Sequence, residues 1–143
     1  MSVAEQIRDD AQAALKQGDR KRASALRMVQ DVLQQEEKLG KGDEIGALQR
    51  ERKKRMEAAE AYAEAGRYEQ AEDERFEAEL ITAYLPAQLT DGELTDVVRD
   101  AIAEAGATEP KQMGQVMGLL KERVAGRADG KRVSTEVRKQ LGA

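Results

Sequence analysis

The chain has 143 residues, which is enough for one domain or for one domain with a small appendage. Aromatic residues make up 3% of it, with one Phe and no Trp, so the core must be built from aliphatic side chains and Ala on helix faces. The chain contains no Cys and no His, which excludes disulfides and Cys nucleophiles and removes the commonest general base and metal ligand. We therefore expect no catalytic residues, no metal site and no cofactor, and a protein that acts by binding.

The formal net charge is −4, but the charges are unevenly distributed. Between Glu57 and Glu104 acidic residues greatly outnumber basic ones, whereas from Lys111 to the end eight basic residues face three acidic ones. A local basic surface can bind polyanions even when the total charge is negative. Residues 1–10 show no apolar signal-peptide core and no apolar run approaches membrane-spanning length, so we expect a cytoplasmic protein without membrane contact.

The first 40 residues predict two helices. Ser2 followed by Glu5 forms a capping-box pattern that starts the first helix, and Gly18 ends it. Asp19 is the expected N-cap of the second helix, whose apolar positions recur at helical spacing up to the break at residues 40–43.

Two further helices are expected before Pro86. The third should end at Gly66 and should turn five residues inward: Ile45, Leu48, Met56, Ala59 and Tyr62. The fourth should run from about Arg67 to Leu85, where the following proline stops it.

The remaining residues predict about three short helices. Thr90 with Glu93 is a second capping box, Gly106 ends that helix, and an apolar stripe follows from Met113 to Val124. The predicted fold is all-α, with an N-terminal bundle of about four longer helices over residues 1–88 and a small C-terminal helical domain over residues 89–143.

Two charged segments have competing interpretations. The basic run from Arg50 to Arg55 is better explained as a solvated surface with ion pairs, such as Glu51 with Arg55, than as a phosphate-binding patch. The acidic helix from Glu69 to Glu79 is better explained as a solvated or partner-facing surface than as a metal site, because helical carboxylate metal sites normally include His.

Glycines in the C-terminal part need a structural explanation. The segment from Gly126 to Lys131 lacks phosphate-loop spacing and follows a helix, so we interpret it as a turn with Asp129 or Gly130 capping the last helix. Gly114 and Gly118 lie within the apolar stripe, where we expect them to allow close helix packing, with a peptide groove as the weaker alternative.

An ordered set of short motifs resembles the GatB/YqeY family over essentially the whole chain. The motifs are Leu26-Arg27, Lys53, Tyr62, Ala65-Gly66-Arg67, Ala71, Glu74, Glu77, Tyr84-Leu85-Pro86, Leu89, Gly106-Ala107, Met113 to Met117 and Gly126 to Gly130. The resemblance implies a free-standing relative of the C-terminal tail region of the GatB subunit of the tRNA-dependent amidotransferase. That region contacts tRNA, while the reaction takes place in other domains and subunits.

Three functions follow as hypotheses. The first is a non-catalytic module that binds RNA, with tRNA favoured, through phosphate contacts from Arg67, Arg127, Lys131, Arg132, Lys53 and Arg27. The second is a protein-interaction adaptor for an amidotransferase or an aminoacyl-tRNA synthetase. The third, which we favour least, is part of a carbon-nitrogen ligase with glutamine as the amido donor.

Overall fold

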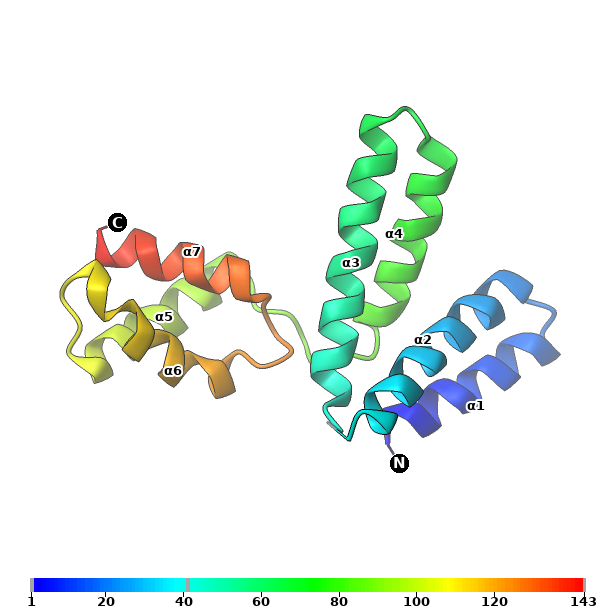
Figure 1. Ribbon diagram of the computed structural model, residues 1–143, viewed down its shortest axis with the longest axis horizontal. Helices are drawn as coiled ribbons and strands as arrows, with labels where there is room; N and C mark the ends of the chain where they lie inside the picture. The colour runs from blue at the N-terminus through cyan, green and yellow to red at the C-terminus, as the bar shows by residue number, and fades with distance from the viewer. Residues whose placement is uncertain (1, 41, 143) are drawn as a thin grey trace. The chain divides into compact units, whose positions relative to one another are not determined.

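The computed structural model describes residues 2–40 and 42–142, and these form seven α-helices, one 3₁₀ turn and no strand (Figure 1). The elements are α1 (Val3–Lys16), α2 (Arg20–Lys38), α3 (Glu44–Glu64), α4 (Tyr68–Thr82), α5 (Asp91–Ala105), η1 (Pro110–Gln112), α6 (Met113–Arg123) and α7 (Gly130–Leu141). The predicted all-α fold is confirmed, although α5 is as long as α4.

The chain divides into two compact units, Met1–Leu85 and Pro86–Ala143, each with its own hydrophobic core. We call them the N-terminal unit, which holds α1 to α4, and the C-terminal unit, which holds α5 to α7. The division falls three residues before the boundary expected from the sequence. No helix within the described residues has both the length and the apolar character needed to cross a membrane.

The helix ends follow the local signals in the sequence. Both capping boxes form: the Glu5 amide donates to Ser2 Oγ at 3.1 Å, and the Glu93 amide donates to Thr90 Oγ1 at 3.1 Å. Asp19 accepts a hydrogen bond from the Arg22 amide at the start of α2, as predicted. These ends could be predicted because each depends on residues three positions apart in the chain.

The fourth helix ends earlier than predicted, at Thr82 and not at Leu85. The Tyr84 amide donates to the Ile81 carbonyl at 2.9 Å and the Leu85 amide to the Thr82 carbonyl at 3.1 Å. These i to i+3 bonds tighten the last turn out of α-helical geometry, which the following proline disfavours in any case.

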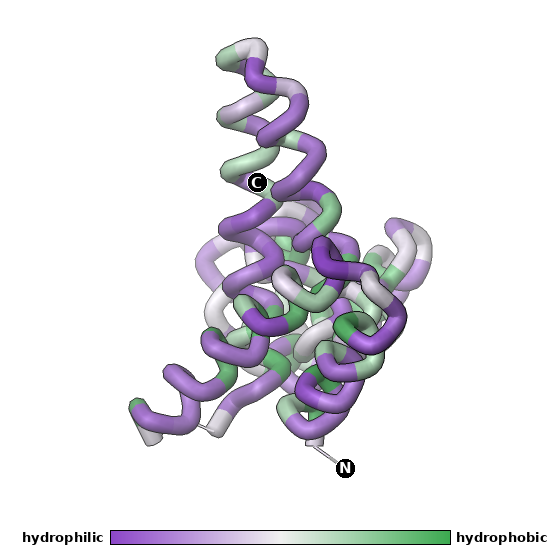
Figure 2. The backbone as a smooth tube through the Cα atoms, turned by 90° about the vertical axis from the view of Figure 1, so that its right-hand side faces the viewer, coloured by the Kyte–Doolittle hydropathy of each residue, from purple (hydrophilic) through white to green (hydrophobic). Residues whose placement is uncertain are grey.

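The core of the N-terminal unit lies between α1, α2 and the adjoining parts of α3 and α4. Its largest fully buried side chains are Ile7, Leu26, Leu48 and Ile81. Because this core extends no further along α3 than Leu48, the outer parts of α3 and α4 form a two-helix hairpin that projects beyond α1 and α2 (Figure 1). Figure 2, in which the end of this α3–α4 hairpin again lies highest, shows no strongly hydrophobic stretch there.

Inside the hairpin, Ala59, Ala71 and Ala78 are buried between the helices. Met56, which the periodicity placed inward, is 47% exposed, so that prediction was wrong. Small alanines bring the two helices close together, and the longer Met side chain lies outside their contact.

One arginine joins α3 to α4 through three carboxylates. Arg55 lies 2.8 Å from Glu51, as the i, i+4 spacing predicted, and 3.3 Å from both Glu74 and Glu77 on the other helix. Burial raises the pKa of Glu77, and repulsion from Glu74 and other acids adds to it, while Arg55 lowers it. The pKa of Arg55 is also raised: burial lowers it, but the attraction of Glu77 and Glu51 and the hydrogen bonds to Glu51 and Glu74 outweigh that effect. One cation thus serves three anions.

The core of the C-terminal unit is formed by α5, α6 and α7, with Val98, Val116, Leu120, Val133 and Val137 fully buried. Two hydrogen bonds join the segment before α5 to the segment between α6 and α7. The Leu89 amide donates to the Arg127 carbonyl at 2.8 Å, and Gln88 Nε2 donates to the Gly126 carbonyl at 2.7 Å.

The stripe on α6 is core, but its glycines do not have the role expected of them. Val116, Leu120 and Val124 are buried and Met113 and Met117 pack against them, so the stripe packs inside the C-terminal unit. Gly114 and Gly118 are exposed, and a Cβ added to either would meet nothing within 4 Å. The prediction that they allow close helix packing was therefore wrong.

Candidate nucleic-acid interface

The last helix carries basic side chains on the surface opposite the core. Val133, Val137 and Leu141 are buried at i, i+4 and i+8, while Lys131, Thr135, Arg138 and Lys139 are exposed. In an α-helix these two sets lie on opposite sides. We call the exposed set the basic face of α7.

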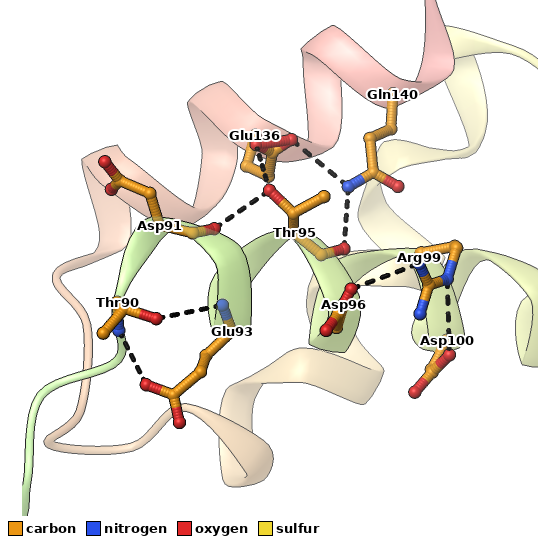
Figure 3. Close-up of polar contacts among 9 residues, drawn as sticks. All are labelled: Thr90, Asp91, Glu93, Thr95, Asp96, Arg99, Asp100, Glu136 and Gln140. Carbon is orange, nitrogen blue, oxygen red and sulfur yellow. Dashed lines mark hydrogen bonds and ion pairs between the residues drawn. The ribbon is translucent and has the colours of Figure 1, made fainter.

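The two acidic residues of this region are used in contacts within the unit. Asp129 Oδ1 accepts a hydrogen bond from the Arg132 amide at 2.8 Å and is the N-cap of α7, one of the two predicted caps. Glu136 is directed toward α5, where its Oε1 lies 3.2 Å from Thr95 Oγ1 (Figure 3). Gln140 Nε2 donates to Glu136 Oε2 at 3.2 Å and to the Thr95 carbonyl at 3.0 Å. Neither carboxylate forms an ion pair with the basic face among the described residues.

Three of the predicted RNA-contacting residues lie in the first turn of α7 or just before it. Arg127 is half-buried, and its Nε donates to the Ala87 carbonyl at 3.3 Å. Arg132 Nη2 lies 2.8 Å from Asp91 Oδ1, and the Asp91 side chain is 99% exposed. Lys131 is exposed and has no ion-pair partner in the described part of the chain.

A groove of about 570 Å³ lies between α5 and α7 and borders the basic face. Its lining includes Lys131, Arg132 and Lys139 on one side and Asp91 and Thr95 on the other. The hydrogen bonds of the capping box with Thr90 lower the pKa of nearby Glu93, and the positive charge of Arg127 contributes. Glu93 therefore stays ionised. The acids that line the groove itself are Asp91 on α5 and Asp129 and Glu136 on the side of the lysines.

The other three predicted contacts lie in the N-terminal unit on separate elements. Arg27 is on α2, Lys53 is on α3, and Arg67 occupies the N-cap position of α4 without a side-chain cap hydrogen bond. All three side chains are exposed. Because they lie on three separate elements, they share no helix face.

The basic run on α3 is largely used inside the N-terminal unit. Arg50 lies 3.0 Å from buried Glu36, Arg52 Nε donates to Thr82 Oγ1 at 2.7 Å, and Arg55 forms the cluster described above. Lys53 and Lys54 remain exposed, with no ion pair among the described residues. The ion-paired interpretation thus describes the arginines of this run better than a continuous phosphate-binding patch does.

The acidic helix is also partly paired. Asp73 lies 3.4 Å from Lys21, and Arg75 pairs with Glu72 three residues before it on the same helix. Within residues 2–40 and 42–142 no group of three or more metal-ligating side chains is placed to hold an ion.

Two residues of the basic face were absent from the predicted contacts. Arg138 and Lys139 project from the same side of α7 as Lys131, and neither has an ion-pair partner among the described residues. Their positions seven and eight residues after Lys131, on the side opposite Val133 and Val137, are the signal that would have identified them.

The fold and this surface define an all-helical protein of two units, one of which presents an uncompensated basic helix face. The chain belongs to the YqeY-like protein family, whose model matches residues 4–141 and so includes both units. Among curated proteins, none matches the chain significantly.

Proposed function

We propose that this protein is a non-catalytic RNA-binding module with tRNA as its favoured ligand. The observation that carries the proposal is the basic face of α7, where Lys131, Arg138 and Lys139 are exposed without a described counter-charge. Phosphate contacts from such side chains position a nucleic acid without reading its bases. Asp129 and Glu136 form no ion pair with these side chains among the described residues, since their carboxylates accept hydrogen bonds from the Arg132 amide, Thr95 and Gln140.

A structured RNA fits this surface better than a single strand does. Proteins that bind single strands stack bases on aromatic side chains, and none of the chain's three Tyr and one Phe falls within residues 86–143. Folded RNA is recognised mostly through its shape, phosphates and 2′-hydroxyls, which basic and hydroxyl side chains contact. Lys131, Lys139 and Thr135 provide such groups side by side.

The choice of tRNA rests on the resemblance to the tail region of the amidotransferase GatB subunit. In that enzyme the tail holds the substrate RNA and other domains carry out the reaction. The absence of Cys and His from this chain supports a role limited to holding RNA. Any reaction on the bound RNA would then belong to a partner, and we place the protein in the cytoplasm with the tRNA pool.

Direct binding tests the proposal. Fluorescence anisotropy with labelled tRNA should show affinity that falls as salt rises, because phosphate contacts release counterions. The double variant Lys131→Gln/Lys139→Gln should bind at least tenfold more weakly and should lower the salt slope by roughly one for each lysine. A matched control, Lys16→Gln/Lys54→Gln, removes two exposed lysines from the N-terminal unit and should retain most of the affinity.

A gain of affinity offers an independent check. Asp91→Asn removes the carboxylate that pairs with Arg132 and frees that guanidinium for phosphate. We expect tighter tRNA binding with an unchanged fold, since an exposed ion pair contributes roughly 0–1 kcal/mol to stability.

For the lysine experiment, an equal loss of tRNA affinity in the double variant and in its matched control, or binding insensitive to salt, would contradict the proposed site.

A further inference from the structure

A groove of about 520 Å³ runs along the α3–α4 hairpin, between the two helices. Its apolar lining is provided by Met56, Ala59 and Ala63 on α3 and by Ala78 on α4. The three α3 residues recur at i, i+3 and i+7, so they form a continuous stripe along one side of that helix. Hydrophobic side chains of another helix could pack along such a stripe.

The core that α3 shares with α1 and α2 extends only to Leu48, so these two helices do not cover the stripe. Met56 is 47% exposed, although it is the largest apolar side chain of the groove. Methionine is flexible and polarizable and is common at surfaces that bind partner helices. Ala59 and Ala78 are already buried between α3 and α4, so the apolar surface that lacks a partner is provided by Met56 and the half-buried Ala63.

Three glutamates and two arginines line the rim of the groove, and both arginines have partners: Arg75 pairs with Glu72, and Arg52 is hydrogen-bonded to Thr82. Glu60 and Glu64 line it on α3 and Glu79 lines it on α4, and none of the three forms an ion pair among the described residues. Glu74 and Glu77 are engaged by Arg55 and Glu72 by Arg75, whereas Glu57 and Glu69 are exposed outside the groove lining without an ion pair among the described residues. Three of the five hairpin glutamates without a described ion pair thus line the groove.

We propose that this groove binds an amphipathic helix of a partner protein whose apolar stripe is flanked by Lys or Arg. Such a helix would place its apolar residues on Met56 and the alanines and its cations against Glu60, Glu64 and Glu79. This is the helix-in-groove mode of recognition, in which apolar anchors supply affinity and rim charges select the partner.

The same charges disfavour the other occupants. RNA would bring phosphates against unpaired glutamates, and a second copy of this hairpin would place glutamates against glutamates. The proposal is independent of the RNA-binding surface on α7, since it rests on different residues of a different unit.

Two designed peptides provide the probe. Each is a helix of about 18 residues, or five turns, with the same leucine stripe, and the stripe is flanked by Lys in one peptide and by Glu in the other. In anisotropy measurements with the full chain, we expect the Lys peptide to bind at least tenfold more tightly than the Glu peptide.

Matched variants locate the binding. Glu60→Gln/Glu64→Gln removes two rim charges and should weaken the Lys peptide about tenfold. Glu57→Gln/Glu69→Gln removes the same charge from exposed positions of the hairpin outside the groove lining and should have little effect. Met56→Ala should weaken binding severalfold, while Met28→Ala, at an exposed methionine of α2, should not. Circular dichroism checks that each variant stays folded.

Four results would overturn the proposal. Equal weakening by both glutamate pairs would mean unspecific attraction to the acidic hairpin, and no binding of either peptide would mean that the groove takes no helix. Self-association of the chain that Met56→Ala abolishes would make a second copy the occupant. Competition by tRNA at the groove would assign the hairpin to RNA. Loss of tRNA binding in the α7 variants with peptide binding intact would leave the groove proposal standing.

Discussion

Replacing Arg55 by Met tests how the α3–α4 hairpin is held together. The substitution keeps a long apolar side chain and removes the one cation that contacts Glu51, Glu74 and Glu77. The arginine side chain is 20% exposed and the three carboxylates are 12% to 21% exposed, so water reaches the cluster only partly.

The size of the effect follows from this partial burial. Exposed ion pairs contribute roughly 0–1 kcal/mol, whereas removal of one partner from a buried pair costs about 3–5 kcal/mol. A cluster one-fifth exposed lies between these limits, so we expect Arg55→Met to lower the free energy of unfolding of the N-terminal unit by about 2–3 kcal/mol at pH 7. Repulsion among the three remaining carboxylates places the effect above that of a surface pair.

The destabilisation caused by Arg55→Met should depend on pH. The pKa of Glu77 is already raised in the folded protein, first by burial, so its charged form costs stability and protonation relieves that cost. Without Arg55 the three carboxylates repel one another more strongly, and the pKa of Glu77 rises further. The destabilisation measured by urea unfolding should therefore shrink as the pH falls from neutral toward the usual carboxyl range.

The control is Arg75→Met on the same hairpin, where the pair with Glu72 is 48% and 69% exposed. We expect its free energy of unfolding to change by less than roughly 1 kcal/mol. Two results would contradict this role of the cluster. One is a change in the free energy of unfolding no larger for Arg55→Met than for Arg75→Met, and the other is an effect of Arg55→Met that is the same at pH 7 and in the usual carboxyl range.

Three further predictions concern stability. Gly118→Ala should raise the melting temperature, because alanine's higher helix propensity adds up to about 1 kcal/mol to the free energy of unfolding and the added methyl group meets no neighbour. A loss of stability would show that the glycine has a packing role. Tyr84→Phe removes the hydroxyl that donates to Asp10 and should cost about 1–2 kcal/mol in urea unfolding, and no change would refute a role for this bond. The pKa of Glu93 is lowered from 4.5 by hydrogen bonds with Thr90, so its capping contribution is present above that pH and is lost as the pH falls; Glu93→Ala should flatten the acid limb of the stability curve, and an unchanged limb would contradict this assignment.

How much the sequence predicts depends on the range of the interaction. The capping boxes at Ser2 and Thr90 and the Glu51–Arg55 pair form as predicted, since each involves residues three or four positions apart. The contacts of Arg55 with α4 and of Arg52 with Thr82 link residues 19 or more positions apart, and the helix pattern alone does not give their register.

The apolar periodicity failed where the partner surface was small or missing. The periodicity placed Met56 inward because the spacing of this residue fits the inward set. Alanines close the contact between α3 and α4, however, and Met56 lies outside that contact. The periodicity also assigned Gly114 and Gly118 to a helix contact, yet both lie on the exposed side of α6. A periodic pattern identifies a helix, whereas the presence of a neighbour is a tertiary property.

The candidate interface could be predicted only in part, because only some of its contacts join residues close in the sequence. Arg127, Lys131 and Arg132 are close in sequence, so any turn followed by a helix brings them together. The pairing of Arg132 with Asp91 could not be foreseen, since it depends on how α5 packs against α7. The full basic face emerged only when the buried side of α7 was known.

Crosslinking of RNA to the protein in cells, followed by sequencing of the recovered RNA, tests the central claim most directly. The comparison is between the unaltered chain and the variant Lys131→Gln/Arg138→Gln/Lys139→Gln, expressed at equal levels. We expect the unaltered chain to recover structured RNA dominated by tRNA and the variant to lose most of it. Recovery at background level, or equal recovery by both proteins, would contradict an RNA-binding role for the basic face of α7.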